Sequence, residues 1–152
     1  MTTPIKQVTL EVHNKFMDIA LDLARNASMD IPIAALIVKD GEIIYSSTNL
    51  KEATQDPTAH AEMVVIREAG KKLGRWRLDD VTLYTTLEPC PMCAGATLFS
   101  RIPVIVFGAY DNIHGAFGSV TNITELFAYY NPQVIGGIRE KESSDLLKKF
   151  FK

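Results

Sequence analysis

Hydrophobic and polar positions follow two different periods along this chain, and the changes of period mark its predicted elements. Between residues 5 and 27, apolar side chains recur every three or four positions with charged ones on the other side, which predicts an amphipathic helix. Residues 33–38 form a continuous apolar run of strand length, which predicts a strand covered on both faces. The pair Asp40-Gly41 favours a tight hairpin turn, so residues 43–45 are expected to return antiparallel.

The rest of the chain alternates helical and strand-like segments. Residues 49–58 are polar and loop-like. Helices are predicted over 57–73, 91–98, 126–129 and 143–151, and strands over 81–86, 104–107 and 134–138. Pro57 and Pro91 suit the first turn of a helix, and Gly74 suits a helix end. Because strands joined through helices run parallel, the pattern predicts a mixed α/β sheet with helices on both faces, in one domain over residues 1–152.

Composition narrows the class of protein. Of 152 residues, 47% are hydrophobic and 22% are charged, which is typical of a globular domain. The net charge of −2 excludes a nucleic-acid binder that relies on bulk positive charge, although a local basic patch remains compatible with it. No apolar run approaches the roughly 20 residues of a membrane span. The first residues do not resemble a signal peptide, so a cytoplasmic location is expected.

The chemistry-bearing residues begin with the only two cysteines, Cys90 and Cys93. Alone, a C-x-x-C pair fits a redox dithiol or half of a structural zinc site as well as a catalytic metal. With His60 the pair makes three ligands, and catalytic zinc sites leave the fourth position to water. Of the other histidines, His13 is expected to be a solvated surface residue, and His114 is a candidate substrate contact in a glycine-rich loop.

Glu62 follows His60 by two positions, too near in sequence for a convenient fourth ligand. A glutamate in the first turn of a helix often serves only the helix dipole. Beside an open zinc site, however, it would take a proton from water and deliver it to a leaving group. The combination H-x-E and P-C-x-x-C is the signature of zinc deaminases, in which hydroxide attacks the carbon that bears an exocyclic amine.

The chain resembles bacterial tRNA-specific adenosine deaminases of the cytidine/deoxycytidylate deaminase superfamily over residues 31–151. The stretches that carry the resemblance are residues 56–62, 87–96, 100–102, 106–109, 111 and 115–119. It implies a cytidine-deaminase-like fold, a three-layer α/β/α arrangement with a five-stranded mixed sheet. It also implies conversion of adenosine to inosine at the wobble position of a tRNA anticodon, by a homodimer with one zinc ion per subunit.

The resemblance further implies roles for individual residues. His60, Cys90 and Cys93 would bind the zinc ion, and Glu62 would move protons. The residues expected to contact the tRNA anticodon loop are Asn49 (the target base), Asp111 (the adjacent backbone), and Phe150 and Phe151 (the loop as a whole). Each of these four also has an ordinary structural explanation, namely a turn residue, a loop cap, and the packing of the last helix.

Some features depart from the family pattern and leave alternatives open. Tyr110 stands where an arginine is common, and the basic tail of many members is missing after Lys152, so RNA binding is expected to rely more on stacking and on Lys148 and Lys149. One alternative is therefore a deaminase of a small free base or nucleoside such as guanine or cytosine. The other is a catalytically inactive zinc scaffold.

Overall fold

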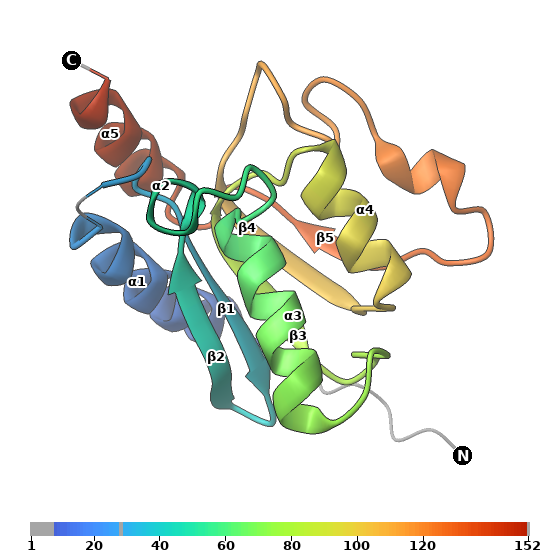
Figure 1. Ribbon diagram of the computed structural model, residues 1–152. Coiled ribbons are helices and arrows are strands. Elements are labelled where there is room, and N and C mark those ends of the chain that lie inside the picture. The colour runs from blue at the N-terminus through green and yellow to red at the C-terminus, as the bar shows by residue number, and fades with distance from the viewer. Residues whose placement is uncertain (1–7, 28, 152) are drawn as a thin grey trace.

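The computed structural model describes residues 8–27 and 29–151, which form one five-stranded mixed sheet in the order β2-β1-β3-β4-β5 (Figure 1). β1 pairs antiparallel with β2 and β3, whereas β3 with β4 and β4 with β5 are parallel pairs. The strands are β1 (Ala34–Lys39), β2 (Glu42–Thr48), β3 (Thr82–Leu87), β4 (Val104–Ala109) and β5 (Gln133–Ile135). The predicted mixed sheet is confirmed.

Helices cover both faces of the sheet. Alternate residues of β1 separate the two cores: Leu36 packs in a cluster with Met17 of α1, and Ile37 packs in a second cluster with Val65 of α3. α5 lies on the same face as α1, and α4 lies beside α3 on the other (Figure 1). The helices are α1 (Leu10–Arg25), α2 (Lys51–Thr54), α3 (Ala61–Leu73), α4 (Pro91–Phe99), the 3₁₀ turn η1 (Ile123–Leu126) and α5 (Glu140–Phe150). The arrangement is the expected three-layer α/β/α fold.

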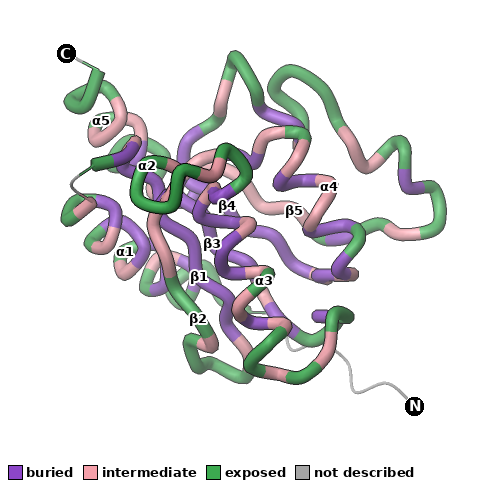
Figure 2. Tube along the Cα trace, in the orientation of Figure 1, coloured by how far each residue is buried: buried purple, intermediate pink, exposed green. Residues whose placement is uncertain are grey.

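Burial follows these layers. β1 and β4 are buried along nearly their whole length, whereas the edge strand β2 is mostly exposed (Figure 2). The hairpin between β1 and β2 turns at Asp40 and Gly41, both of which have positive φ angles, 51° and 77°. Two successive positive φ angles match the right-handed twist of the flanking strands, and this is why an Asp-Gly pair predicts the turn correctly. Among the described residues, no helix is long and apolar enough to cross a membrane.

The predicted starts of the first two long helices are too early in the sequence. α1 begins at Leu10, after Thr9, whose side chain accepts a hydrogen bond from the Val12 N–H; residues 5–7 of the predicted helix lie outside the described residues. α3 begins at Ala61 and not at Pro57. Residues 56–59 form a turn closed by the Ala59 N–H on the Asp56 carbonyl, with proline in its second position. The predicted polar loop also contains the short helix α2.

Near the C-terminus the order of the predicted elements is confirmed, but the type of one element and the bounds of the others differ. The segment between β4 and β5 contains one 3₁₀ turn at residues 123–126, capped by Asn122, where an α-helix at 126–129 was predicted. β5 ends at Ile135 because Gly136 and Gly137 turn the chain away, Gly137 with a φ of 84°. α5 begins at Glu140, three residues before the predicted start.

The expectation that His13 is solvated is also wrong. Its side chain is 5% exposed, and its Nδ1 lies 2.8 Å from the hydroxyl of Tyr84 in β3. Burial lowers the pKa of His13 below its ordinary value and raises the pKa of Tyr84 to about 12. The lowered pKa favours a neutral imidazole, which hydrogen-bonds the tyrosine hydroxyl between α1 and the sheet.

This buried histidine makes stability depend on pH. Because the pKa of His13 is lower in the folded protein than in the unfolded chain, the free energy of unfolding is expected to fall as the pH drops below about 6.5. In His13→Gln, whose amide can still accept from Tyr84, that fall should be smaller. Urea unfolding near pH 7.5 and near pH 5.5 measures it, with the exposed His114→Gln as control. An unchanged pH dependence in His13→Gln would contradict the assignment.

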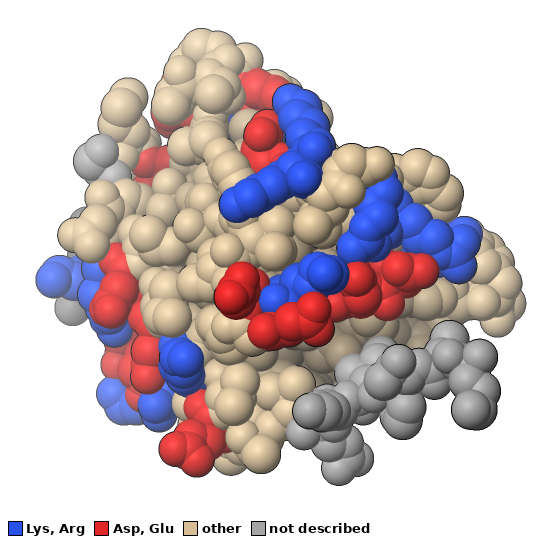
Figure 3. Space-filling view, turned by 90° about the horizontal axis from the view of Figure 1, so that it is seen from below, with Lys and Arg blue, Asp and Glu red and all other residues tan. Residues whose placement is uncertain are grey.

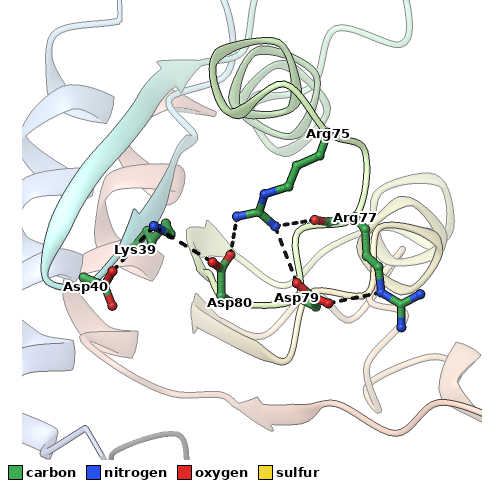
Figure 4. A network of polar contacts seen from close by, with 6 residues as sticks. All are labelled: Lys39, Asp40, Arg75, Arg77, Asp79 and Asp80. Atoms are coloured by element: carbon green, nitrogen blue, oxygen red, sulfur yellow. Dashed lines mark hydrogen bonds and ion pairs between the residues drawn. The ribbon is translucent and has the colours of Figure 1, made fainter. Parts of the chain in front are cut away.

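Acidic and basic side chains interleave at the end of the sheet where β3 begins (Figure 3). Arg75 contacts Asp80 at 2.6 Å and Asp79 at 3.5 Å, and Lys39 extends the network from the hairpin (Figure 4). These side chains are a third or more exposed, with Lys39 just below that, so each pair contributes little to stability. The chemistry-bearing residues gather at the opposite end, where β3 finishes.

Candidate active site

The two helices of one layer begin at the same end of the sheet, and their first residues converge. His60 is the N-cap of α3 and Cys90 is the N-cap of α4, while Cys93 lies in the first turn of α4. An N-cap side chain commonly bonds the free N–H groups of its own helix. Neither His60 nor Cys90 does so, and both side chains are left free to face one another.

The three side chains lie at distances that suit one tetrahedral zinc ion. The His60 Nδ1 is 3.6 Å from the Cys90 Sγ and 3.5 Å from the Cys93 Sγ. All three ligand atoms lie within 4.8 Å of one another. Sulfur and nitrogen ligands at normal zinc bond lengths, on a tetrahedron, are about 3.6 Å apart. The two distances from His60 therefore suit a shared zinc ion, and three protein ligands leave one position open.

The proton affinities of the three groups are strongly coupled. A hydrogen bond from the Cys93 thiol lowers the pKa of Cys90 to about 4. The same bond, together with burial, raises the pKa of Cys93. A hydrogen bond to Cys90 raises the pKa of His60. Because the helix N-termini and the imidazole favour negative charge here, a thiolate is stabilised at Cys90.

Glu62 is the second residue of α3, and its side chain lies in the same site as these ligands. Its side chain is 5% exposed, and burial raises the pKa of its carboxyl group above the ordinary range. A carboxyl group with a raised pKa exchanges protons more readily near neutral pH than an exposed one. A glutamate that only stabilises the helix dipole can remain exposed, so the burial of Glu62 indicates a further role.

Asn49 connects the end of β2 to the start of α3. It is 6% exposed, and its Oδ1 accepts the Ala61 N–H at 2.8 Å. Of the two polar atoms of the Asn49 amide, only the oxygen accepts a hydrogen bond, so the bond from the Ala61 N–H fixes the orientation of the amide. Its Nδ2 is then the group available to a ligand, as a hydrogen-bond donor. The same side chain thus caps α3 and lines the cavity described next.

A cavity of about 860 Å³ opens above these residues. Its volume lies in the range of sites that enclose a small organic ligand. Strand ends, the start of α4, the loop after β4 and the end of α5 all contribute to its wall. The lining residues that matter below are Asn49, His60, Glu62, Glu88, Cys90, Tyr110, Asp111, His114 and Phe151.

The predicted RNA contact Asp111 and the candidate substrate contact His114 lie on the loop after β4. The Asp111 Oδ1 accepts the N–H groups of Ile113 and His114 at 2.9 and 3.0 Å, so Asp111 does cap its own loop. One carboxylate oxygen is occupied in this way, and both Asp111 and His114 also line the cavity. The structural and the substrate-binding explanations of Asp111 are therefore compatible.

Only one ring of the aromatic pair at the end of α5 lies at the cavity. Phe151 lines the cavity, whereas Phe150 is not among its lining residues. The two rings are edge to face with centroids 5.1 Å apart, and both side chains are exposed. Phe150 thus supports Phe151 from outside the cavity.

Two cavity residues carry no functional assignment from the sequence. Glu88 lies directly before Pro89 and Cys90, inside the recognised motif, and is 2% exposed. Tyr110 was noted only as a departure from an arginine; its ring packs edge to face on Phe107, with centroids 5.2 Å apart. The signal for Glu88 is a lone acidic residue at the end of an otherwise buried strand. Nothing in the sequence pattern indicates what it binds.

Comparison with known proteins agrees with this site. Residues 10–109 match the model of the cytidine and deoxycytidylate deaminase zinc-binding region. A tRNA-specific adenosine deaminase of Bacillus subtilis (strain 168) is 47% identical over 124 residues, which are 81% of this chain and 77% of the relative.

Two solved structures are also similar. One comes from a study of A-to-I editing by tRNA:A34 deaminases at the wobble position of transfer RNA; it has a TM-score of 0.82 and 43% identity, and the match covers 88% of this chain and 99% of the other. A guanine deaminase from Bacillus subtilis has a TM-score of 0.62 and 46% identity, over 64% of each chain.

Proposed function

The chain belongs to the zinc-binding cytidine and deoxycytidylate deaminase family, among its tRNA-specific adenosine deaminases, and from this we propose its reaction. The protein is a zinc-dependent hydrolase that converts adenosine to inosine at the wobble position of a tRNA anticodon. The observation that carries the proposal is the cluster of three zinc-type ligands beside a buried glutamate; His60, Cys90 and Glu62 of this group line a cavity of about 860 Å³.

The zinc ion is held by His60, Cys90 and Cys93. Their spacing of 3.5 and 3.6 Å and their position at two helix N-termini support this assignment. Bound zinc lowers the pKa of water toward neutrality and so supplies the hydroxide that hydrolytic deamination needs.

Glu62 handles the protons of the reaction. Its carboxylate accepts a proton from the attacking water oxygen and donates it to the exocyclic nitrogen of adenine, which leaves as ammonia. One carboxyl group serves as base and then as acid, so it ends each turnover in its starting state. Burial supports this role because it raises the pKa of Glu62 and excludes bulk water.

The substrate is held by groups on both sides of the cavity. The target base, extruded from the anticodon loop, accepts a hydrogen bond from the Asn49 Nδ2. Asp111 contacts the neighbouring nucleotide, and the exposed rings of Phe150 and Phe151 hold the loop by stacking. Residues that follow β2, lie in the loop after β4 and lie at the end of α5 thus hold the target base and its neighbours.

An assay of substrate class tests the proposed reaction. The zinc-loaded protein is incubated with an anticodon stem-loop that has adenosine at the wobble position, and with free adenosine, guanine and cytosine in parallel. We expect ammonia and inosine from the stem-loop alone. Ammonia from a free base with the stem-loop unchanged would overturn the tRNA assignment and leave the deaminase chemistry in place.

A free purine base is the second candidate substrate. The similarity to a guanine deaminase, at 46% identity over 64% of each chain, favours it. The cavity is also lined by Tyr110, an uncharged ring at a position where an arginine is common in the family. The assay above separates the two candidates directly.

The protein acts in the cytoplasm as a homodimer. The apolar residues 92–99 fit an interface or the core, and part of the segment is core: Cys93, Ala94 and Leu98 are buried. Its end remains apolar and open: Phe99 is 63% exposed, and its ring lies 5.0 Å from that of Phe127, next to which Leu126 and Tyr129 are exposed.

Association is expected to bury this apolar surface. Sedimentation at micromolar concentration should therefore give twice the 16.9 kDa mass of one chain, and Phe99→Asp should shift it toward the monomer. A control such as Asp22→Asn, in α1 on the other face of the sheet, should leave the mass unchanged. A 16.9 kDa species for the wild-type protein would contradict the dimer.

A further inference from the structure

Glu88 is a buried carboxylate surrounded by hydrogen-bond donors from a single loop. Its Oε1 accepts the Asp111 N–H at 3.1 Å and the hydroxyl of Ser119. Its Oε2 accepts the N–H groups of Phe117 and Ser119 at 3.1 and 3.2 Å. Three backbone donors and one hydroxyl thus converge on one side chain that is 2% exposed. No other side chain in the described ranges receives so many.

The backbone next to Glu88 continues this contact. The Glu88 N–H donates to the Ala109 carbonyl at 2.9 Å, and the Ala116 N–H donates to the Pro89 carbonyl at 2.9 Å. Residues 88–89 therefore bind both ends of the loop formed by residues 110–119. The next residue is Cys90, one of the zinc-type ligands, so a single short segment positions both the ligand and the loop.

The loop is shaped around this carboxylate. Gly115 passes so close to it that a Cβ atom there would overlap the Glu88 carboxyl group and the Asp111 carbonyl oxygen. The residues that the loop presents to the cavity are Tyr110, Asp111, Asn112, Ile113 and His114. The bond from the Asp111 N–H to Glu88 lies at the start of this set, where a shift would move all of them.

We propose that Glu88 is a positioning residue for substrate binding, which holds the loop 110–119 in the shape that receives the nucleotide. Glu88 acts through Asp111 and its neighbours, and takes no part in the proton transfers or in binding the metal. The inference rests on the proposed function, since it assumes that the cavity binds the substrate.

The amide variant Glu88→Gln tests this role with almost no change in size. A glutamine has one acceptor oxygen, and its NH₂ group replaces the other. Whichever oxygen is replaced, the NH₂ group faces at least one backbone N–H, either that of Asp111 or those of Phe117 and Ser119. Two donors then oppose each other in a buried position, and the loop must shift.

Two further variants change residues of the loop itself and leave Glu88 in place. Gly115→Ala pushes the loop away from an intact Glu88 carboxylate. Ser119→Ala removes one hydroxyl donor and leaves the three backbone donors in place. If Glu88 acts by holding the loop, Gly115→Ala should reproduce the effect of Glu88→Gln, and Ser119→Ala should show a much smaller one.

The experiment measures KM and kcat with the anticodon stem-loop, zinc content, and amide hydrogen exchange in residues 110–119. In Glu88→Gln and Gly115→Ala we expect KM to rise by about tenfold or more, the effect of one unpaired buried donor, with zinc content retained and faster exchange. Unchanged KM and unchanged exchange in a folded, zinc-loaded Glu88→Gln would overturn the proposal. So would a loss of zinc, because Glu88 would then serve the metal site.

The design separates failure of this inference from failure of the proposed function. If the wild-type protein deaminates a free base and not the stem-loop, the proposed function fails, and KM is then measured with that base. The inference is overturned if the variants leave this KM and the exchange rates unchanged. It stands if both change, because the loop lines the cavity whichever substrate enters it.

Discussion

Glu62→Ala is expected to abolish deamination while the protein keeps its zinc ion. The carboxyl group is buried beside the candidate metal ligands, and burial raises its pKa, so its loss removes the group that moves protons during the reaction. General acid–base catalysis contributes a factor of roughly 10² to 10⁴ in rate, and kcat should fall at least that far. KM for the anticodon stem-loop should change much less, because Glu62 is not expected to hold the RNA.

Metal analysis and steady-state kinetics on one preparation check this expectation. Glu68→Ala is the matched control, since Glu68 lies on the same helix with its side chain paired to Lys71 at 3.3 Å, away from the cavity. Turnover near the wild-type rate in Glu62→Ala would show that another group carries the proton. Loss of zinc in the same variant would show that Glu62 acts as a ligand.

Cys93→Ala is expected to remove zinc, activity and part of the stability together. Cys93 is fully buried in the first turn of α4, and its Sγ lies 3.5 Å from the His60 Nδ1. A metal ion that binds only the folded protein stabilises it by mass action, by about 4 kcal/mol at a thousandfold excess over Kd. The variant should therefore unfold at a lower temperature than the zinc-loaded protein and should not respond to a chelator.

Thermal unfolding with and without a chelator measures this effect. The wild-type protein should lose stability when zinc is removed, and Cys93→Ala should show the same curve in both conditions. Ser100→Ala, at the end of the same helix, removes a buried hydroxyl that bonds the Ala96 carbonyl and should respond to the chelator as the wild type does. A Cys93→Ala protein with one zinc ion per chain would contradict the ligand assignment.

The fold could be predicted from the sequence because its signals are local. The continuous apolar run at residues 33–38 and the Asp40-Gly41 turn specify a buried strand and a hairpin without knowledge of the rest of the chain. The candidate metal site could also be predicted from the sequence, because the spacing of Cys90 and Cys93 places two ligands within one helical turn. His60 adds the third ligand from the start of another helix in the same layer.

The features that sequence reasoning missed depend on contacts between distant segments. His13 lies among polar residues of an amphipathic helix, yet the Tyr84 hydroxyl, 71 residues away, makes its burial favourable. Glu88 is held by N–H groups 23 to 31 positions further along the chain. Backbone donors carry no side-chain signature, so no pattern in the sequence reveals where they converge.

The central claim is that this cavity deaminates adenosine at the wobble position, and the position of inosine in an intact tRNA tests it most directly. The zinc-loaded protein is incubated with a tRNA that has a wobble adenosine, and with the same tRNA carrying adenosine at the adjacent anticodon position instead. Nuclease digestion and mass spectrometry then locate any inosine. We expect inosine at the wobble position of the first tRNA and none in the second. No inosine in either tRNA, with ammonia released from free guanine, would contradict it.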